Sequence, residues 1–393
     1  MPDSIIHEIL SRLDDTKEAV RTCILSKNWT HHWKYVHSLS FHHESFKTGI
    51  LAFEEFVLHV LQHRQHSINI RKLRFFLGAK QNQSLINCVL DHAMLRQLKK
   101  LETDVCSFPP SLLESRTLET VNYGVSSGDF IVRSNSMIFA RLKNLQLTGV
   151  HIDCNDFFSC CSNLENLRLT DCRVSNTEIL NINLPRLVQL IITDIRYDKG
   201  LIIIISGPKL KRFEFKGIYN PYNPSLVLEI RRKMNEDLNL VKLKFYCSDG
   251  ELDSIDSIIE TLTSIVFEYA ISHRFEELET DIVDNFPATL FECQTLKTLK
   301  LGQTTKCLRG LSGFATLTTL QLSSVIIDLE NDMFFGCLNL ENLLLIECTL
   351  LADPVQVVMG DYTISAPWLV NLQISDFLYR GRLVINGPRL KFF

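Results

Sequence analysis

The chain has 393 residues, with 41 basic and 45 acidic side chains, so its formal net charge is −4 at pH 7. That balance excludes bulk electrostatic attraction to nucleic acid. The longest aliphatic run, at 201–205, is too short to cross a bilayer, and charged side chains interrupt the apolar stretch near the start, which argues against a secretory signal. The twelve cysteines form no C-x-x-C pair, so we expect buried thiols in a reducing compartment, cytoplasmic or nuclear.

Apolar residues at helical spacing predict three short helices in the first forty residues. The stripes are Ile6, Ile9, Leu10 and Leu13, then Val20, Cys23 and Ile24, then Trp29 and Trp33. Three helices of this length cannot bury much surface among themselves. Two interpretations follow: the segment caps the domain behind it, or its remaining apolar surface binds a partner protein.

An ordered series of residues favours the partner. The series is Pro2, Asp3, Ile6, Leu10, Leu13, Ala19-Val20-Arg21-Thr22, Leu25-Ser26-Lys27, Trp29 and Trp33. It resembles the F-box, the helical module that docks on the Skp-family adaptor of cullin-based ubiquitin ligases. The resemblance implies an F-box at 1–45, a linker helix region at 46–67, and adaptor-facing or core roles for Pro2, Ile6, Leu10, Leu13, Val20, Leu25, Trp29 and Trp33.

Three features depart from the F-box pattern. Met1 stands where a leucine usually precedes the proline, Asp14-Asp15 replaces a shorter turn, and Asn28 replaces a common arginine. A first helix without its lead-in is prone to fray. A degenerate F-box on a pure interaction scaffold therefore stays open as an alternative.

From about residue 68 onward the spacing Leu-x-x-Leu-x-Leu recurs. Copies begin at residues 142, 164, 187, 210, 240, 296, 317, 340 and 369, with degenerate copies at 70 and 118. Most successive copies start roughly 21–24 residues apart, which is typical of leucine-rich repeats, and Cys172 and Cys348 occupy the Asn/Cys position after the strand. The predicted fold class is α/β: a short three-helix F-box followed by a curved leucine-rich-repeat solenoid, 68–393, with a parallel concave sheet.

A longer period indicates an internal duplication of about 91–215 as about 268–393. Leu101-Glu102-Thr103-Asp104-Val105 recurs as Leu278-Glu279-Thr280-Asp281-Ile282, and the segment at 161–167 recurs at 337–343. The second copy stops at Phe392-Phe393, inside a repeat that continues in the first copy. Because solenoids need a polar terminal cap, we expect either that the chain is incomplete or that this last edge is covered by something absent from the sequence.

A cluster of cations marks a candidate surface for a target protein. Arg212, Lys216, Lys242 and Lys244 fall between the leucines of adjacent strands, with Tyr246 beside them. One interpretation is a solvated charged face. The other is an anchor for an acidic segment of a substrate protein, because clustered cations attract and hold carboxylates or phosphates.

The sequence offers little for catalysis. There is no phosphate-binding glycine loop, nucleophile elbow or kinase signature. His59, His63 and His66 share one helix face without an acidic or thiol partner, and the adjacent pairs His31-His32 and His42-His43 diverge, so we expect all of them to be solvated. We predict no enzyme, no metal and no cofactor.

The two modules together resemble plant F-box/leucine-rich-repeat proteins. That resemblance implies a substrate receptor of an SCF-type ubiquitin ligase, with a Skp-family adaptor, a cullin reached through it, and an unidentified target protein as partners, and without nucleic acid or membrane. A small-molecule co-receptor is the remaining alternative, since some F-box repeat proteins act in that way.

Overall fold

The computed structural model describes residues 2–46, 49–79, 81–105, 109, 112, 115–124, 131–132, 141–197, 200–217, 226–230, 242–247, 267–268, 271–272, 274–281, 290, 293–302, 307–308, 314–328, 334, 337–351, 361–376 and 382–391. The chain divides into two compact units. The amino-terminal unit is Met1–Leu187 with Ile195–Asp198, and the carboxy-terminal unit is Val188–Asp194 with Lys199–Phe393.

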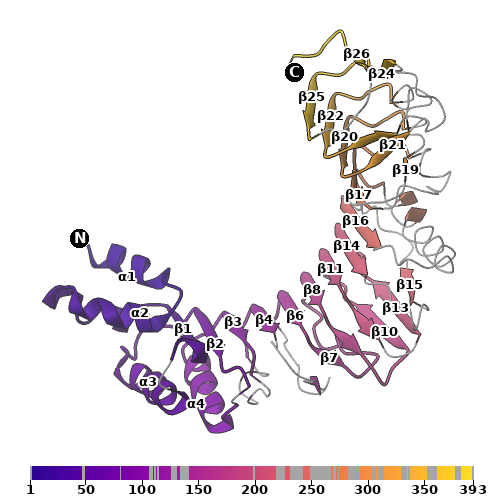
Figure 1. Cartoon of the computed structure of the whole chain (residues 1–393). Coiled ribbons are helices and arrows are strands. Elements are labelled where there is room, and N and C mark those ends of the chain that lie inside the picture. The colour runs from indigo at the N-terminus through magenta and orange to yellow at the C-terminus, as the bar shows by residue number, and fades with distance from the viewer. Residues whose placement is uncertain are drawn as a thin grey trace. The chain divides into compact units, whose positions relative to one another are not determined.

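Short helices open the amino-terminal unit (Figure 1). They are α1 (Asp3–Ser11), α2 (Thr16–Arg21) and the 3-10 turns η1 (Thr22–Ile24), η2 (Lys27–Trp29) and η3 (His32–Tyr35). Asp15 caps α2, because its carboxylate accepts a hydrogen bond from the backbone N–H of Lys17 at 2.8 Å. Helix α1 contacts η3, and α2 contacts both η1 and η3. The predicted third helix is therefore two separate 3-10 turns, one for each tryptophan.

A parallel sheet follows directly. Its strands in this unit are β1 (Ser38–His42), β2 (Lys72–Phe76), β3 (Lys100–Thr103), β4 (Thr120–Gly124), β6 (Asn144–Thr148) and β8 (Asn166–Thr170). Strand β1 pairs with β2 so that Phe41 lies opposite Phe75. The sheet thus begins at Ser38, inside the segment predicted as F-box. The domain boundaries at 45 and 67 stay a prediction.

Helices cover one face of the first repeats. They are α3 (Ile50–His63) and α4 (Gln83–Met94), with the turn η4 (His43–Ser45) before α3 (Figure 1). Phe53 of α3 is fully buried and its ring stacks on Phe75 of β2, with ring centroids 6.4 Å apart. Asn82 caps α4 by accepting from the N–H groups of Ser84 and Leu85. These contacts join the helical layer to the inward leucine and phenylalanine positions.

Later repeats in this unit return through short strands in place of helices. These are β5 (Ile131–Val132), β7 (His151–Ile152), β9 (Arg173–Val174), β10 (Ile179–Asn183) and β12 (Arg196–Tyr197), of which β5, β7, β9 and β12 form a second parallel sheet. Leu145, Leu147 and Leu167 are buried between the two layers. Each repeat alone leaves this surface uncovered, so stacking stabilises the core.

The carboxy-terminal unit repeats the same plan. Its main parallel run is β11 (Gln189–Thr193), β14 (Arg212–Gly217), β16 (Lys242–Cys247), β17 (Glu277–Thr280), β18 (Thr298–Gly302), β20 (Thr319–Ser323), β22 (Asn342–Ile346) and β25 (Asn371–Ser375). The return strands are β13 (Leu201–Ser206) with β15 (Leu226–Ile230), then β19 (Cys307–Leu308), β21 (Ile326–Asp328) and β23 (Thr349–Leu351), then β24 (Asp361–Ser365) with β26 (Arg382–Asn386). The parallel-sheet leucine-rich-repeat fold with amino-terminal helices is thereby confirmed.

The residue after many of these strands has a left-handed backbone that turns the chain out of the sheet. Asp171, Ser324 and Glu347 have φ of 52°, 54° and 54°. Cys172 and Cys348 come next and are fully buried, where their thiols donate to the carbonyl oxygens of Leu147 (3.6 Å) and Leu322 (3.3 Å). The predicted cysteine position in the repeat is confirmed, and burial raises the pKa of Cys172 to about 11.

Among the helices in the described ranges, none is long and apolar enough to span a membrane.

Candidate functional site

The eight residues predicted to face the adaptor or the core divide between the two roles. The buried ones are Ile6, Leu10 and Trp33, the half-buried ones are Leu13, Val20 and Trp29, and the exposed ones are Pro2 and Leu25. Helix α1 directs Ile6 and Leu10 inward, against the 3-10 turns. Leu25, at 65% exposure, keeps an apolar side chain in solvent directly after η1.

Three exposed apolar residues of the same module were missing from that prediction. Ile5 and Ile9 of α1 are 48% and 42% exposed, and Ile24 of η1 is 87% exposed. A signal for the first two exists in the sequence, because α1 holds two i, i+4 apolar pairs: Ile5 with Ile9, and Ile6 with Leu10. One pair fills the core, and the other is left on the surface.

The interior of this module contains a histidine pair. His7 Nε2 and His32 Nδ1 are 3.1 Å apart, and the His7 ring stacks on Tyr35. Burial, and then the neighbouring His32, lower the pKa of His7. The prediction that His31-His32 is exposed is wrong for His32, which is buried where it contacts His7 and the edge of Trp29.

The pair His42-His43 is also less solvated than predicted. His42 stacks on Phe76 and His43 meets the edge of Phe53, and both are half-buried. The interpretation of His59, His63 and His66 as exposed surface residues is confirmed. Within the described residues, no group of three or more His, Cys, Asp and Glu side chains could hold a metal ion.

The loop between α1 and α2 lies on the polar face of the first strands. The Asp14 carboxylate pairs with Arg74 of β2 at 3.3 Å, and the Asp14 carbonyl oxygen accepts from the Ser40 hydroxyl of β1 at 2.6 Å. The Ser40 backbone N–H donates to the Thr16 hydroxyl at 2.7 Å. The loop is therefore attached mainly through Ser40 of β1, because the Asp14 carboxylate is almost fully exposed and its ion pair contributes little.

Glu102 of β3 lies at the centre of a group of cations on the same face. Its carboxylate contacts Arg74 at 2.9 Å, Lys100 at 2.9 Å and Lys72 at 3.1 Å. Burial alone would raise the pKa of Glu102, but the hydrogen bonds and charges of Lys100 and Lys72 outweigh it and lower the pKa. The carboxylate stays ionised and neutralises part of this positive surface.

The predicted cation cluster lies on the corresponding face of the carboxy-terminal unit. Arg212 and Lys216 of β14 are exposed, whereas Lys242 and Lys244 of β16 are half-buried. Tyr246 belongs to β16, but its side chain lies outside the described residues. The structure thus brings four of the five predicted residues onto two paired strands.

Two glutamates of β17 pair with the lysines, and sequence reasoning missed them. Glu277 binds Lys242 at 2.7 Å and Lys300 at 3.0 Å, while Glu279 binds Lys244 at 2.9 Å. Burial acts to raise the pKa of Glu277, and the two lysines acting together lower it. Strand β17 lacks the third leucine of the repeat spacing, but the duplicated Leu-Glu-Thr-Asp sequence indicates its position.

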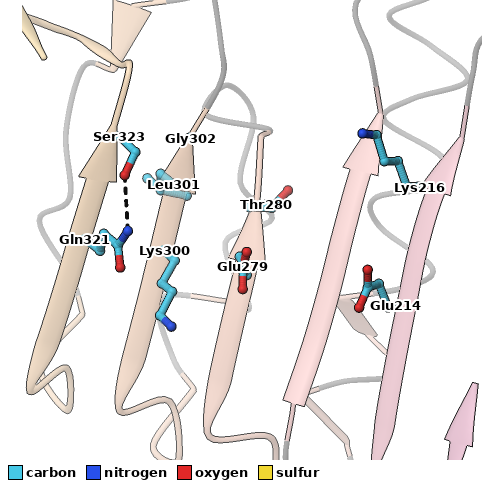
Figure 2. Close-up of a pocket in the computed structure, with 9 residues that line it drawn as sticks. All are labelled: Glu214, Lys216, Glu279, Thr280, Lys300, Leu301, Gly302, Gln321 and Ser323. Atoms are coloured by element: carbon cyan, nitrogen blue, oxygen red, sulfur yellow. Dashed lines mark hydrogen bonds between the residues drawn. The ribbon is translucent and has the colours of Figure 1, made fainter. Parts of the chain in front are cut away.

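A cavity of about 350 Å³ opens on this face. Figure 2 shows Glu214 and Lys216 of β14 at one side, with Glu279, Lys300 and Gln321 on the strands at the other side. The remaining lining residues are Thr280, Leu301, Gly302 and Ser323. The Gln321 side-chain amide donates to the Ser323 hydroxyl at 3.2 Å. The cavity therefore presents ammonium, carboxylate, amide and hydroxyl groups together, a set that suits a polar ligand.

Comparison with known proteins places the repeats in a family. Residues 57–268, more than half of the chain, match the family described as "At1g61320/AtMIF1, LRR domain". The Arabidopsis thaliana protein "Putative FBD-associated F-box protein At1g55030" is 30% identical over 49% of this chain and 46% of its own length. "Putative F-box/FBD/LRR-repeat protein At5g56810", from the same plant, is 27% identical over 77% of this chain and 74% of its own length.

The chain spans about half the length of the first of these relatives. A crystal structure of an internalin (inlF) from Listeria monocytogenes is similar over 93% of this chain and 96% of its own, with 12% identity and a TM-score of 0.38. The fold assignment rests on the strand order and register of this chain and does not use the similarity to the internalin. The resemblance to plant F-box/leucine-rich-repeat proteins is confirmed, and the chain belongs to the At1g61320/AtMIF1 leucine-rich-repeat domain family.

Proposed function

We propose that the protein is the substrate-recognition subunit of an SCF-type ubiquitin ligase in the cytoplasm or nucleus. Its amino-terminal helices bind a Skp-family adaptor and, through it, a cullin scaffold, while its repeats bind a target protein. The protein carries out no bond chemistry itself. It raises the effective concentration of target lysines near the ubiquitin-loaded enzyme held elsewhere in the complex.

The observation that supports this proposal most is the apolar surface of the helical module. Ile5, Ile9, Ile24 and Leu25 remain exposed although Ile6 and Leu10 beside them are buried. Large apolar side chains left exposed on a small helical module are typical of a protein interface. The F-box in the names of the plant relatives agrees with an adaptor as the occupant.

The module's attachment gives the proposal a mechanical basis. Strand β1 continues the sheet of the first repeats, and Arg64, the residue that follows α3, donates to the carbonyl oxygens of Val36 and Ile68. The Arg64 side chain is buried, so these bonds persist without competition from water. An adaptor bound to α1 and η1 is thereby held at a fixed position relative to the first repeats.

The test is a charge placed in the exposed apolar surface. Ile24→Asp should abolish capture of the purified Skp-family adaptor by the full chain, because burying an unpaired carboxylate in an interface is unfavourable. Its matched control is Leu95→Asp, after α4, since Leu95 is similarly exposed at 83%. Neither change affects the core, so circular dichroism should be unaltered in both.

Equal adaptor capture by the wild type and Ile24→Asp would contradict the proposed interface. No capture by the wild type would instead support the scaffold with a degenerate F-box.

A further inference from the structure

Two runs of strands, one in each unit, have matching polar faces. The first is β1-β2-β3-β4-β6 and the second is β14-β16-β17-β18-β20. The central register row reads Ser40, Arg74, Glu102, Asn122 and Gln146 in the first run, and Glu214, Lys244, Glu279, Lys300 and Gln321 in the second. The correspondence supports the predicted internal duplication and extends it to β2 and β16, which read Lys-Leu-Arg-Phe-Phe and Lys-Leu-Lys-Phe-Tyr.

The same cross-strand ion pair occurs in both runs. Arg74 contacts Glu102 at 2.9 Å, and Lys244 contacts Glu279 at 2.9 Å. In each run the pair joins the second strand to the third, and a glycine follows at the end of the fourth strand, Gly124 or Gly302. The two faces therefore correspond strand by strand. Their rows match in chemistry at the second, third and fifth positions and differ at the first and fourth.

In the first run this row is occupied by an acidic turn from outside the repeats. Asp14 places its carboxylate on Arg74 and its carbonyl oxygen on the Ser40 hydroxyl. In the second run, the corresponding row lines the cavity through Glu214, Glu279, Lys300 and Gln321. Lys244, the counterpart of Arg74, does not line this cavity, and Glu214 stands in the place of Ser40. The first run therefore shows what kind of segment such a face accepts, but the cavity offers different contacts.

Charge favours a similar segment at the second site. The polar face of β14, β16, β17 and β18 holds five cations and three carboxylates, in a chain whose net charge is −4. Lys242, Lys244 and Lys300 share Glu277 and Glu279. Among the described residues, Lys216 has no ion-pair partner. Among the same residues Arg212 has none either, and it does not line the cavity. Part of the unbalanced positive charge therefore lies at the cavity, on Lys216, where a carboxylate would be attracted.

We propose that this cavity binds an acidic turn of the target protein, with one partner carboxylate on Lys216 and another near Lys300, which lies three strands away. Gln321 and Ser323 offer hydrogen bonds to the backbone of that turn, as Ser40 does to Asp14. Glu214, which replaces Ser40, repels a carboxylate and accepts a backbone N–H, so the acidic residues are directed away from the middle of β14. A cavity of about 350 Å³ suits a few residues of such a turn. The conclusion that the bound protein is marked for degradation rests on the proposed function. The binding of an acidic turn to the cavity does not depend on that function.

The experiment uses a labelled cyclic peptide that presents the chain's own turn, Leu-Asp-Asp-Thr, from positions 13–16. Fluorescence anisotropy measures its binding to the full chain without adaptor. We expect saturable binding that weakens with salt, and a loss of about tenfold or more for Lys216→Glu and for Lys300→Glu, because each removes a charge-assisted contact. Lys209→Glu is the matched control, since Lys209 is exposed and does not line the cavity.

Two further peptides identify the anion. The Leu-Asn-Asn-Thr peptide should bind at least about tenfold more weakly, and a peptide with phosphoserine in place of the first aspartate tests phosphate. Binding of the phosphopeptide alone would overturn the carboxylate ligand. Absence of binding by all three peptides, or equal binding by the Lys216→Glu and Lys209→Glu variants, would overturn the site. The Ile24→Asp variant must bind the acidic peptide like the wild type, so failure of adaptor binding is distinguished from failure of this site.

Discussion

Shortening residues on opposite faces of α1 should separate stability from adaptor binding. Leu10 points into the module and is 2% exposed, whereas Ile5 and Ile9 lie on the surface of the same helix. The perturbations are Leu10→Ala and the double change Ile5→Ala/Ile9→Ala. All of them leave α1 with alanine, which is the best helix former, so the helix itself is not weakened.

The expected magnitudes follow from burial. Leu10→Ala leaves a cavity and should cost about 2–5 kcal/mol of local stability. Full burial of an isoleucine side chain contributes about 1.5–3 kcal/mol, so covering the exposed near-half of both isoleucines contributes about 2 kcal/mol to binding. Their loss corresponds to a roughly 30-fold weaker adaptor affinity. The cost of the double change to stability should stay below about 1 kcal/mol, as for most exposed positions.

Two measurements are needed because the chain has two units and a single unfolding free energy is not defined for it. Native-state hydrogen exchange of the α1 amides reports the local opening free energy. Titration calorimetry with the purified adaptor reports the affinity. The reasoning is refuted if Ile5→Ala/Ile9→Ala lowers α1 protection as much as Leu10→Ala, or if the double variant binds the adaptor within about twofold of the wild type.

Two further predictions concern charge in the first repeats. Glu102→Gln should destabilise β2 and β3 by about 1–3 kcal/mol, a figure that is already reduced for the partial exposure of the cations around Glu102. The control Glu119→Gln should change stability little, because the contact of Glu119 with Lys99 is exposed. Equal hydrogen-exchange protection in both variants would contradict this prediction. Because the pKa of Glu102 is depressed, its contribution is complete above its ordinary pKa of 4.5 and is lost as the pH falls below it. Burial first, and then Arg96 and Arg64, lower the pKa of His92 to about 4, so the folded state holds this residue neutral and loses stability as the pH falls from 6.5 towards 4. His92→Phe should reduce the dependence of the melting temperature on pH between 6.5 and 4. An unchanged dependence would contradict the role given to His92.

The repeat spacing predicted the strands well, because an inward leucine is needed wherever neighbouring repeats stack. It missed β1, which lies inside the F-box-like segment. Ser38-Leu39-Ser40-Phe41-His42 alternates polar and apolar residues, and Leu39 and Phe41 are fully buried. That period of two indicates a strand, but the segment lies within the part of the chain where the F-box resemblance predicts helices.

The surfaces were harder to predict than the core. On α1 the hydrophobic pattern covers adjacent faces, so spacing alone could not decide between Ile9 and Leu10 as the outward residue. In the carboxy-terminal unit, the partner of Lys242 is Glu277, a residue far along the chain that reaches it through strand register. Ion pairs of this kind depend on which strands become neighbours. They cannot be predicted from the sequence when one of the strands, here β17, lacks the full leucine spacing.

The matching polar faces suggest how a target site arises in a repeat protein. A cation on one strand opposite a glutamate on the next, as in Arg74 with Glu102 or Lys244 with Glu279, limits repulsion along a row of basic side chains. Charge remains on either side of the pair, and it can attach an acidic loop of the same chain or of another protein. In the first run it pairs with Asp14 of the helical module, an exposed contact that contributes little by itself. In the second run, where Lys216 lies beside a cavity, the same chemistry remains available for a partner, and recognition of a target requires no new fold.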